Sequence, residues 1–514
     1  MIAYISRRLG ALLVILFGSS FLLYNLEALS GDPTENLRLS QDPKAQYELL
    51  ALIRQLDLNT PPPIRYFKWL KGVLGAFTGH VNFGMTRDAH SVTEQLAGAI
   101  PTTIRLVTGS ALIALVLGLM LGIITALRQY SRFDYVVTFF SFLMFSLPIF
   151  WVAVLLKQFM AIRFNDFLAH SQIGGTWVIV FSAMTALFWA GVIAQEKKRF
   201  IQIFAGVFIA NVALLELLNA IHWIANPRLG PVAILLGSIG VAYGVTTLST
   251  GLENKSALKA SLVMAGVTTL LYYPINAIFK KHSSGFVVFI LALLTVATAV
   301  LVGLALAKID RGPVIRTTVI SSLIMGFLIF VDRLMQSWKD YLTQDGVYGR
   351  PIPTVGQSDP LLSSTDFWII TMDRFTHIIL PTVALTLISF AGYVRFSRGT
   401  MLEVLNQDYI RTARAKGLNE RTVIMRHAFR NTLIPISTIV VVDLAGIIGG
   451  AIITERVFGW HGMGTLFNQA ITSFDLNLLM GVFAVTATLS VLANLVADLL
   501  YTALDPRIRV GGGK

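Results

Sequence analysis

Long runs of apolar residues, separated by shorter polar stretches, form the pattern along this chain. Many of these runs reach about 20 residues, the length that an α-helix needs to cross a hydrocarbon core roughly 30 Å thick. In lipid a helix satisfies its own backbone hydrogen bonds, so the pattern predicts an all-α polytopic membrane protein. The predicted spans, about twelve in total, are 9–26, 103–127, 135–161, 176–194, 200–218, 231–249, 260–279, 286–307, 317–334, 377–394, 433–453 and 478–501.

Two longer polar regions interrupt this pattern. Residues 27–100 contain short amphipathic pieces and predict an ordered external segment near the membrane interface, and residues 335–376 predict a second external stretch. Pro148 lies inside the third apolar run and predicts a kink there, because proline has no backbone N–H to donate. The first run follows Arg7 and Arg8 and has no small-x-small cleavage site, so we expect a retained span rather than a signal peptide.

Composition and charge narrow the class of protein further. Only 13% of the 514 residues are charged, whereas soluble domains carry about 25%. The net charge of +13 would suggest nucleic acid in a soluble chain, but here the basic residues lie mainly in short loops, where they set orientation in a bilayer. Their distribution predicts a membrane protein with both termini in the cytoplasm and no nucleic-acid partner. The chain has no cysteine, which excludes disulfides and thiolate metal sites.

One basic stretch stands between two of the apolar runs, in "DYIRTARAKGLNERTVIMRHAFRNTLIP" (408–435). Gly417 occupies the position of a left-handed helix cap, and Asn419 is a good first residue for a second helix. We therefore expect a helix, a sharp turn and a short helix on the cytoplasmic face. The apolar residues mixed among the basic ones leave two interpretations open: the second helix lies on anionic membrane lipid, or it docks to a soluble partner.

The stretch "LEVLNQDYIRTARAKGLNERTVIMRHAFRNTLIP" resembles the cytoplasmic signature loop of ABC importer permeases, in particular the dipeptide/oligopeptide permease family. Further segments look like family segments in family order, among them "RRLGALLVILFGSSFLL", "IPTTIRLVTGSALIALVLGLMLGIITAL", "FSLPIFWVAVLL", "HIILPTVALTL" and "ERVFGWHGMGTLFNQAI". The resemblance implies a type I ABC importer permease core made of residues 1–165 and 345–514, with a coupling loop at 395–432. Residues 166–344 then form an inserted block of about six additional spans, for which we predict no function.

By the same resemblance, the chain is expected to be the permease subunit of an ATP-driven importer of di- or oligopeptides or similar solutes, and not itself an enzyme. The implied partners are a homologous second permease subunit, two ABC ATPase subunits and an extracytoplasmic solute-binding protein. In this family the short helix after the glycine docks on the ATPase. The residues expected to make this coupling contact are Ala413, Ala415, Gly417, Arg421, Val423, Arg426, His427 and Phe429.

Few other residues suggest chemistry. Asp443 lies inside an apolar run, where an ionisable group is costly, so it is expected either to line the substrate pathway or to hydrogen-bond across a helix interface. Pro148 is the second candidate for the pathway. The sequence contains no GxxxxGK[ST] phosphate loop and no HExxH spacing, so we expect no cofactor and no metal. The segment "FGWHGMG" predicts an external tight turn before a short helix.

Two other classes of protein remain open at this point. A twelve-span secondary transporter driven by an ion gradient would usually show two similar halves around a central cytoplasmic loop, whereas the basic stretch here is far from the centre. A membrane-embedded enzyme or scaffold would need a polar cluster in the inserted block. Asn211, Glu216 and His222 are the candidates for such a cluster.

Overall fold

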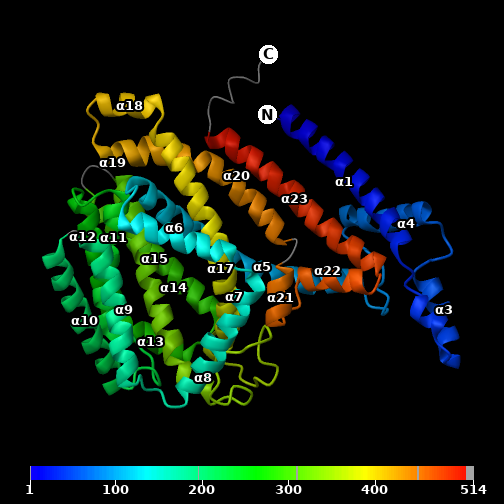
Figure 1. Cartoon of the computed structure of the whole chain (residues 1–514), viewed down its shortest axis with the longest axis horizontal. Coiled ribbons are helices and arrows are strands. Elements are labelled where there is room, and N and C mark those ends of the chain that lie inside the picture. Colours follow the sequence, from blue (N-terminus) through cyan, green and yellow to red (C-terminus); the bar gives the residue numbers. More distant parts are fainter. Residues whose placement is uncertain (1, 195, 308–310, 449–450, 505–514) are drawn as a thin grey trace. The chain divides into compact units, whose positions relative to one another are not determined.

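The computed structural model describes residues 2–194, 196–307, 311–448 and 451–504. Within these ranges the fold is all-α, with an isolated bridge between Met85 and Ser91 and no β-strand (Figure 1). The chain forms two compact units: an interrupted unit, Met1–Lys157 with Ile378–Lys514, and an inserted unit, Gln158–His377. These boundaries differ from the predicted ones at 165/166 and 344/345, and the domain interpretation of the block remains a prediction.

The interrupted unit contains helices from both ends of the chain. Its first part comprises α1 (Ile2–Ser30), α2 (Glu35–Leu39), α3 (Pro43–Gln55), α4 (Pro62–Leu74), the 3₁₀ turn η1 (Gly75–Thr78), α5 (Val92–Leu127), α6 (Arg132–Ser146) and α7 (Ile149–Leu156). Its second part comprises the end of α17 (Phe367–Leu405), α18 (Asp408–Ala415), α19 (Glu420–Thr422), the π-helical turn η3 (Val423–Ala428), α20 (Phe429–Ile448), α21 (Ile452–Phe458), α22 (Met463–Thr472) and α23 (Leu476–Leu504).

The two parts of the interrupted unit are held together by packing between distant helices. α1 lies alongside α23 (Figure 1), and α4 packs on α1 through the buried rings of Tyr24, Tyr66 and Trp69. The Tyr66 hydroxyl also shares a buried hydrogen bond of 2.8 Å with the hydroxyl of Ser20. The amphipathic piece in 27–100 is therefore ordered, as predicted, and its apolar face covers the chain's own first helix.

α5 approaches α17 through a face made by two glycines. A Cβ on Gly122 would stand 2.7 Å from the Cβ of Ser397 and 2.8 Å from the carbonyl oxygen of Val394, and a Cβ on Gly118 would collide with Tyr393. This spacing is the small-xxx-small pattern by which membrane helices come close without a hydrophobic driving force. This contact between α5 and α17 joins the two parts of the interrupted unit.

The inserted unit is a helical bundle. Its elements are the π-helical turn η2 (Lys157–Ile162), α8 (Arg163–Leu168), α9 (Gly175–Ile193), α10 (Lys197–Ala220), α11 (Gly230–Ser249), α12 (Lys255–Leu270), α13 (Tyr272–Lys281), α14 (Gly285–Leu306), α15 (Arg311–Gln336), α16 (Trp338–Leu342) and the start of α17. Buried small residues repeat every four positions, as in Ser238, Ala242 and Thr246 of α11. Hydroxyl pairs such as Ser249 with Thr317 and Ser261 with Ser321 link neighbouring helices. This pattern is how helices pack in lipid.

A buried carboxylate ties three helices of the inserted unit together. Asp332 of α15 is fully buried and accepts hydrogen bonds from the Tyr272 hydroxyl at 2.7 Å, the Gln336 amide at 2.8 Å and the backbone N–H of Leu229 at 2.6 Å. Its position near the end of a predicted span would suggest a side chain that reaches toward water. The structure shows a structural acceptor instead.

The apolar pattern predicted the spans with one exception. Nine helices of the described residues are long and apolar enough to cross a membrane, or up to eleven if each of two bent pairs is one span. These correspond to all predicted spans except 433–453, which α20 overlaps as far as Ile448; residues 449–450 of that span lie outside the described residues.

The kink predicted at Pro148 in the span 135–161 is confirmed, and the span predicted over 260–279 also contains a bend, which was not predicted. The first bends by 102° at Pro148, because a residue before proline is pushed out of the helical region and Leu147 is extended, with ψ 131°. The second bends by 50° at Leu271, where Pro274 has no N–H for the carbonyl of Leu270.

Candidate functional site

The basic stretch folds into two helices joined by a tight turn. α18 ends at Ala415 with Lys416 as its C-cap, and Gly417 has a left-handed φ of +75°. α19 begins after Asn419, whose side-chain oxygen accepts a hydrogen bond from the N–H of Thr422 at 2.8 Å. The predicted left-handed cap at Gly417 and the predicted helix start at Asn419 are both confirmed.

An ion pair closes the turn on its outer side. The Arg414 guanidinium donates to both carboxylate oxygens of Glu420, at 2.7 and 3.2 Å. This hydrogen bonding lowers the pKa of Glu420 below its ordinary value, so the stabilisation is present at neutral pH and is lost as acid protonates the carboxylate. Both side chains are exposed, and such a pair contributes about 0–1 kcal/mol.

The turn rests on a hydrophobic base. Val423 and Ala428 of η3 are fully buried, and they pack with Ile410 and Ala413 of α18 and with Met401 of α17. The π-helical register adds a residue to one turn of the chain, a distortion that is frequent at functional sites. The turn is therefore held firmly by the interrupted unit.

The structure brings the eight predicted coupling residues together in this turn. Ala413 and Val423 face inward, so any part they take in a contact is indirect. His427 and Phe429 are half-buried, and the side of the turn open to solvent carries Ala415, Gly417, Arg421 and Arg426. Their role in docking remains a prediction.

Two apolar side chains lie exposed among the basic residues of the turn and were not among the predicted coupling residues. Leu418 is 40% exposed and Met425 is 48% exposed. They add an apolar part to the basic outer surface of the turn.

The two candidates for the substrate pathway lie elsewhere in the interrupted unit. Pro148 stands at the start of α7, where the chain bends, and Asp443 lies on α20 with its side chain exposed. Asp443 also interacts with the hydroxyl of the buried Tyr393 on α17. This contact supports the interpretation that Asp443 links helices, and its role in a pathway stays a prediction.

A buried carboxylate that the sequence did not point out organises the turn after α21. Glu455 is fully buried and accepts hydrogen bonds from the Thr103 hydroxyl of α5 at 2.8 Å and from the N–H of Thr465 at 2.8 Å. Gly459 provides a left-handed φ of +64°, and a side chain on Gly462 would collide with Thr103 and Glu455. The predicted tight turn before a short helix is confirmed, and Glu455 ties it to α5.

Replacing Glu455 with alanine should lower the free energy of unfolding by about 2–3 kcal/mol, because buried donors lose their acceptor. Glu455→Gln, which keeps one acceptor oxygen, should cost less. Thermal unfolding in detergent would measure both, with Glu48→Ala, an exposed glutamate of α3, as the control. Equal melting temperatures for Glu455→Ala and the control would contradict this role.

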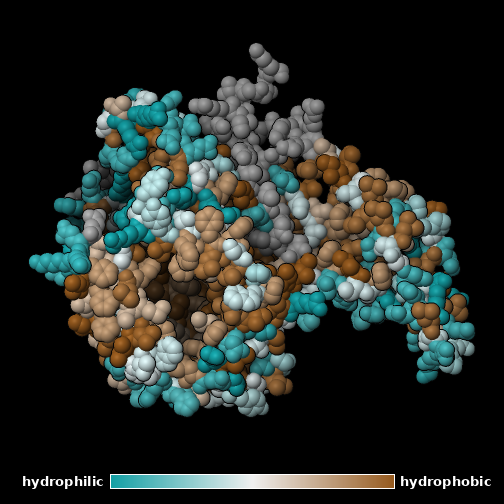
Figure 2. Space-filling view, viewed as in Figure 1, coloured by the Kyte–Doolittle hydropathy of each residue, from teal (hydrophilic) through white to brown (hydrophobic). Residues whose placement is uncertain are grey.

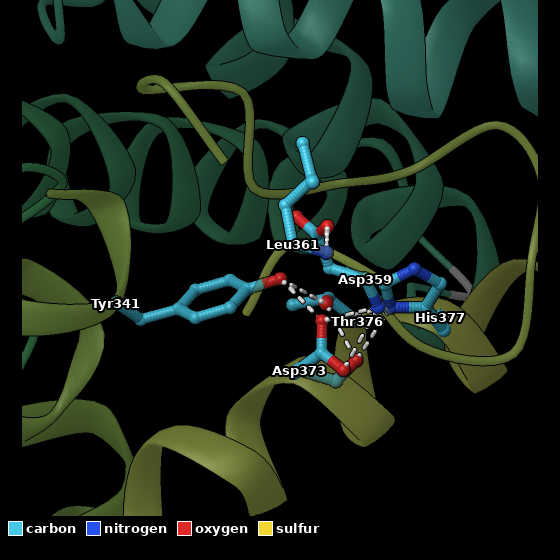
Figure 3. Close-up of polar contacts among 6 residues, drawn as sticks. All are labelled: Tyr341, Asp359, Leu361, Asp373, Thr376 and His377. Carbon is cyan, nitrogen blue, oxygen red and sulfur yellow. Dashed lines mark hydrogen bonds and ion pairs between the residues drawn. The ribbon is translucent and has the colours of Figure 1, made fainter. Parts of the chain in front are cut away.

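A second buried polar cluster lies in the inserted unit (Figure 3). Tyr341 of α16 points toward α17, where its hydroxyl donates to Asp373 at 3.2 Å and lies 3.0 Å from the Thr376 hydroxyl. Asp373 also pairs with the Nδ1 of His377 at 3.2 Å and accepts from the N–H of Asp359. The cluster fixes the loop before α17 to that helix.

The same loop is anchored on α8. The Asn165 side chain donates to the carbonyl of Ile352 at 2.8 Å and accepts from the N–H of the same residue at 3.1 Å. Arg350 pairs with Asp166 at 2.8 Å. Since these contacts account for the partners of the buried groups, we assign the cluster a structural role. No group of three or more His, Asp or Glu side chains suited to a metal occurs in the part of the chain that the structure describes.

Comparison with known proteins agrees with this architecture. A protein-family model described as "Binding-protein-dependent transport system inner membrane component" matches residues 262–510. The oligopeptide transport system permease protein OppB of Mycobacterium tuberculosis is 44% identical over 138 residues, 27% of this chain and 42% of that protein. The dipeptide transport system permease protein DppB of Escherichia coli is also 44% identical over 138 residues, 41% of its length. The oligopeptide permease protein AppB of Bacillus subtilis is 24% identical over 510 residues, 99% of both chains.

The matches to the OppB and DppB proteins thus span less than half the length of those relatives. The apolar helices and the matched family together define a multi-pass, all-α membrane protein. Over residues 262–510 the chain is similar to the family of binding-protein-dependent transport inner-membrane components, and the relatives compared are permease proteins of peptide transport systems.

Proposed function

We propose that this chain is the membrane-spanning permease subunit of an ATP-driven ABC importer for di- or oligopeptides or similar solutes. It works with a homologous second permease, two ATPase subunits and an extracytoplasmic solute-binding protein, and ATP is hydrolysed on the ATPases. The names of the relatives and the matched family support this assignment. Both termini then lie in the cytoplasm of a cell inner or plasma membrane, on the side of the α18–α19 turn.

The observation that carries the proposal is the geometry of this turn. A coupling element must transmit the movement of a soluble ATPase to the membrane helices without deforming. Val423 and Ala413 lock the turn to α17, while Arg421, Arg426 and Met425 remain exposed on its outer surface. The turn therefore combines a buried base with an exposed basic and apolar face.

This face fits an acidic groove with an apolar floor on a protein better than a lipid surface. A helix that lies on headgroups inserts its apolar face into the membrane boundary. Here Val423 and Ala428, the most buried apolar groups of η3, face the interrupted unit instead. The remaining exposed apolar groups, Leu418 and Met425, are too few for stable anchoring and suit a protein contact.

Purification of the tagged chain from its native membrane in mild detergent tests the proposal. Mass spectrometry should identify a second permease and ATPase subunits, and a bound solute-binding protein would lead to the cargo. A matched preparation of the Arg421→Glu, Arg426→Glu variant should retain the second permease and lose the ATPases. If the unaltered chain comes out alone under conditions that preserve known ABC complexes, an ion-gradient-driven transporter becomes the better assignment.

A further inference from the structure

The inserted unit contains a large apolar cavity that the proposed function does not use. Its volume is about 1080 Å³, and ten of its 22 lining residues are phenylalanine or tryptophan. Figure 2 shows a hollow with hydrophobic walls on this face of the inserted unit. A cavity of this size exceeds the usual range for drug-sized ligands, about 300–1,000 Å³. Water is a poor occupant, because each buried water needs 2–4 polar partners.

The cavity begins at one end of the membrane helices. Trp177 stands near the start of α9, Trp223 follows the end of α10, and Trp338 follows the end of α15, and all three line the cavity. Tryptophan is enriched at the membrane–water interface. This end of the cavity therefore lies at interfacial depth.

From that end the cavity extends into the apolar part of the helices. Phe327 and Met335 of α15 both line it, and their separation along the helix corresponds to about 12 Å at roughly 1.5 Å per residue. One leaflet contributes about half of a hydrocarbon core roughly 30 Å thick. The cavity thus matches the depth of a single leaflet.

Two polar groups accompany the apolar walls. The indole N–H of Trp338 is buried and has no hydrogen-bond acceptor among the residues that the structure describes. A buried donor without a partner costs about 1–3 kcal/mol, so an acceptor from a ligand would be stabilising. Arg163, which also lines the cavity, is exposed and lies 5.0 Å from the centre of the Phe159 ring. Its guanidinium is available to an anionic group.

We propose that the inserted unit binds a membrane phospholipid in this cavity. An acyl chain lies against the aromatic walls, an ester carbonyl accepts from Trp338, and the phosphate pairs with Arg163. A peptide cargo fits the site poorly, because its backbone groups would find few partners on such walls. A phospholipid supplies an apolar chain, an acceptor and an anion, which match the apolar walls, the indole N–H of Trp338 and the guanidinium of Arg163.

Photo-crosslinking in the full complex, in nanodiscs that contain phosphatidylglycerol, tests this inference. When bulk lipid is removed with detergent before photolysis, a photoreactive phenylalanine analogue at position 181, which lines the cavity, should give an adduct with the mass of one lipid. The same analogue at position 188, an exposed phenylalanine of α9 outside the cavity, should give little retained adduct.

Substitution of the polar groups provides the second measurement. Arg163→Gln should lower lipid retention by about tenfold, the scale of one lost charge-assisted hydrogen bond. Trp338→Phe, which keeps the aromatic ring and removes the N–H, should lower it by a smaller factor. Arg228→Gln, an exposed arginine outside the cavity, is the control and should leave retention unchanged. A crosslink from position 181 to another protein subunit, or equal retention in all variants, would overturn the proposal.

Discussion

Replacing Gly417 with valine should lower ATP-driven transport by roughly 5–30-fold while the chain still folds and inserts. Gly417 has a φ of +75°, and a left-handed conformation costs a non-glycine residue about 1–2 kcal/mol, which shifts a two-state population by that factor. No atom lies within 4 Å of where its Cβ would be, so the cost is backbone strain and not a clash. Under the proposed coupling role, the turn would relax, and its outer face would no longer meet the ATPase in the same orientation.

Gly417→Asn is the matched control, because asparagine tolerates the left-handed region better than other residues and should retain most of the activity. Solute uptake and ATP hydrolysis would be measured together in proteoliposomes that contain the whole complex. The expected result for valine is continued ATP hydrolysis with little uptake. Normal uptake by the valine variant would show that the turn is not the mechanical joint.

Replacing Asp134 with alanine should lower the free energy of unfolding by about 3 kcal/mol, the lower end of the range for a broken buried ion pair. Asp134 is buried at the start of α6 and accepts from the Arg398 guanidinium of α17 at 3.0 and 2.9 Å. It also accepts from the N–H of Tyr130, which has a left-handed φ of +61°. The change would leave Arg398, which is only partly exposed, without its carboxylate.

A second ion pair of the same type offers a matched comparison. Arg350 and Asp166 are 58% and 60% exposed, so Asp166→Ala should cost less than about 1 kcal/mol. Denaturation in detergent would compare the two variants, and the double variant Asp134→Ala, Arg398→Ala should recover part of the loss. Similar stabilities for Asp134→Ala and Asp166→Ala would contradict the assigned role of burial.

Local signals in the sequence predicted local structure. Apolar runs marked the membrane helices because lipid leaves a long apolar segment no alternative to the helix. Gly417 and Asn419 could be assigned from their intrinsic preferences, since a cap depends on residues only a few positions away. The same signal was available for Ser91 and Glu94, a capping pair that starts α5 well before the predicted position of 103.

Contacts between distant residues could not be predicted in this way. Glu455 and Thr103 are 352 positions apart, and neither belongs to a sequence motif that would indicate their contact. Asp332 depends on Tyr272, 60 positions earlier, and its place near a span end suggested solvent instead. The inward side of η3 also depends on the helices beneath it, so the burial of Val423 was not evident from its neighbours in sequence.

The interrupted unit also sets an order of events during synthesis. Gly118 and Gly122 pack on α17, Asp134 pairs with Arg398, and Thr103 pairs with Glu455. The partners of α5 and α6 are therefore synthesised only after residue 377. At about 5–20 residues per second, the ribosome needs roughly 10 to 45 s to make residues 158–377. During that interval the carboxylate of Asp134 lacks its arginine partner, and Gly118 and Gly122 lack the helix on which they pack. The nascent chain is therefore expected to depend on the insertion machinery for longer than a permease whose halves are made in succession.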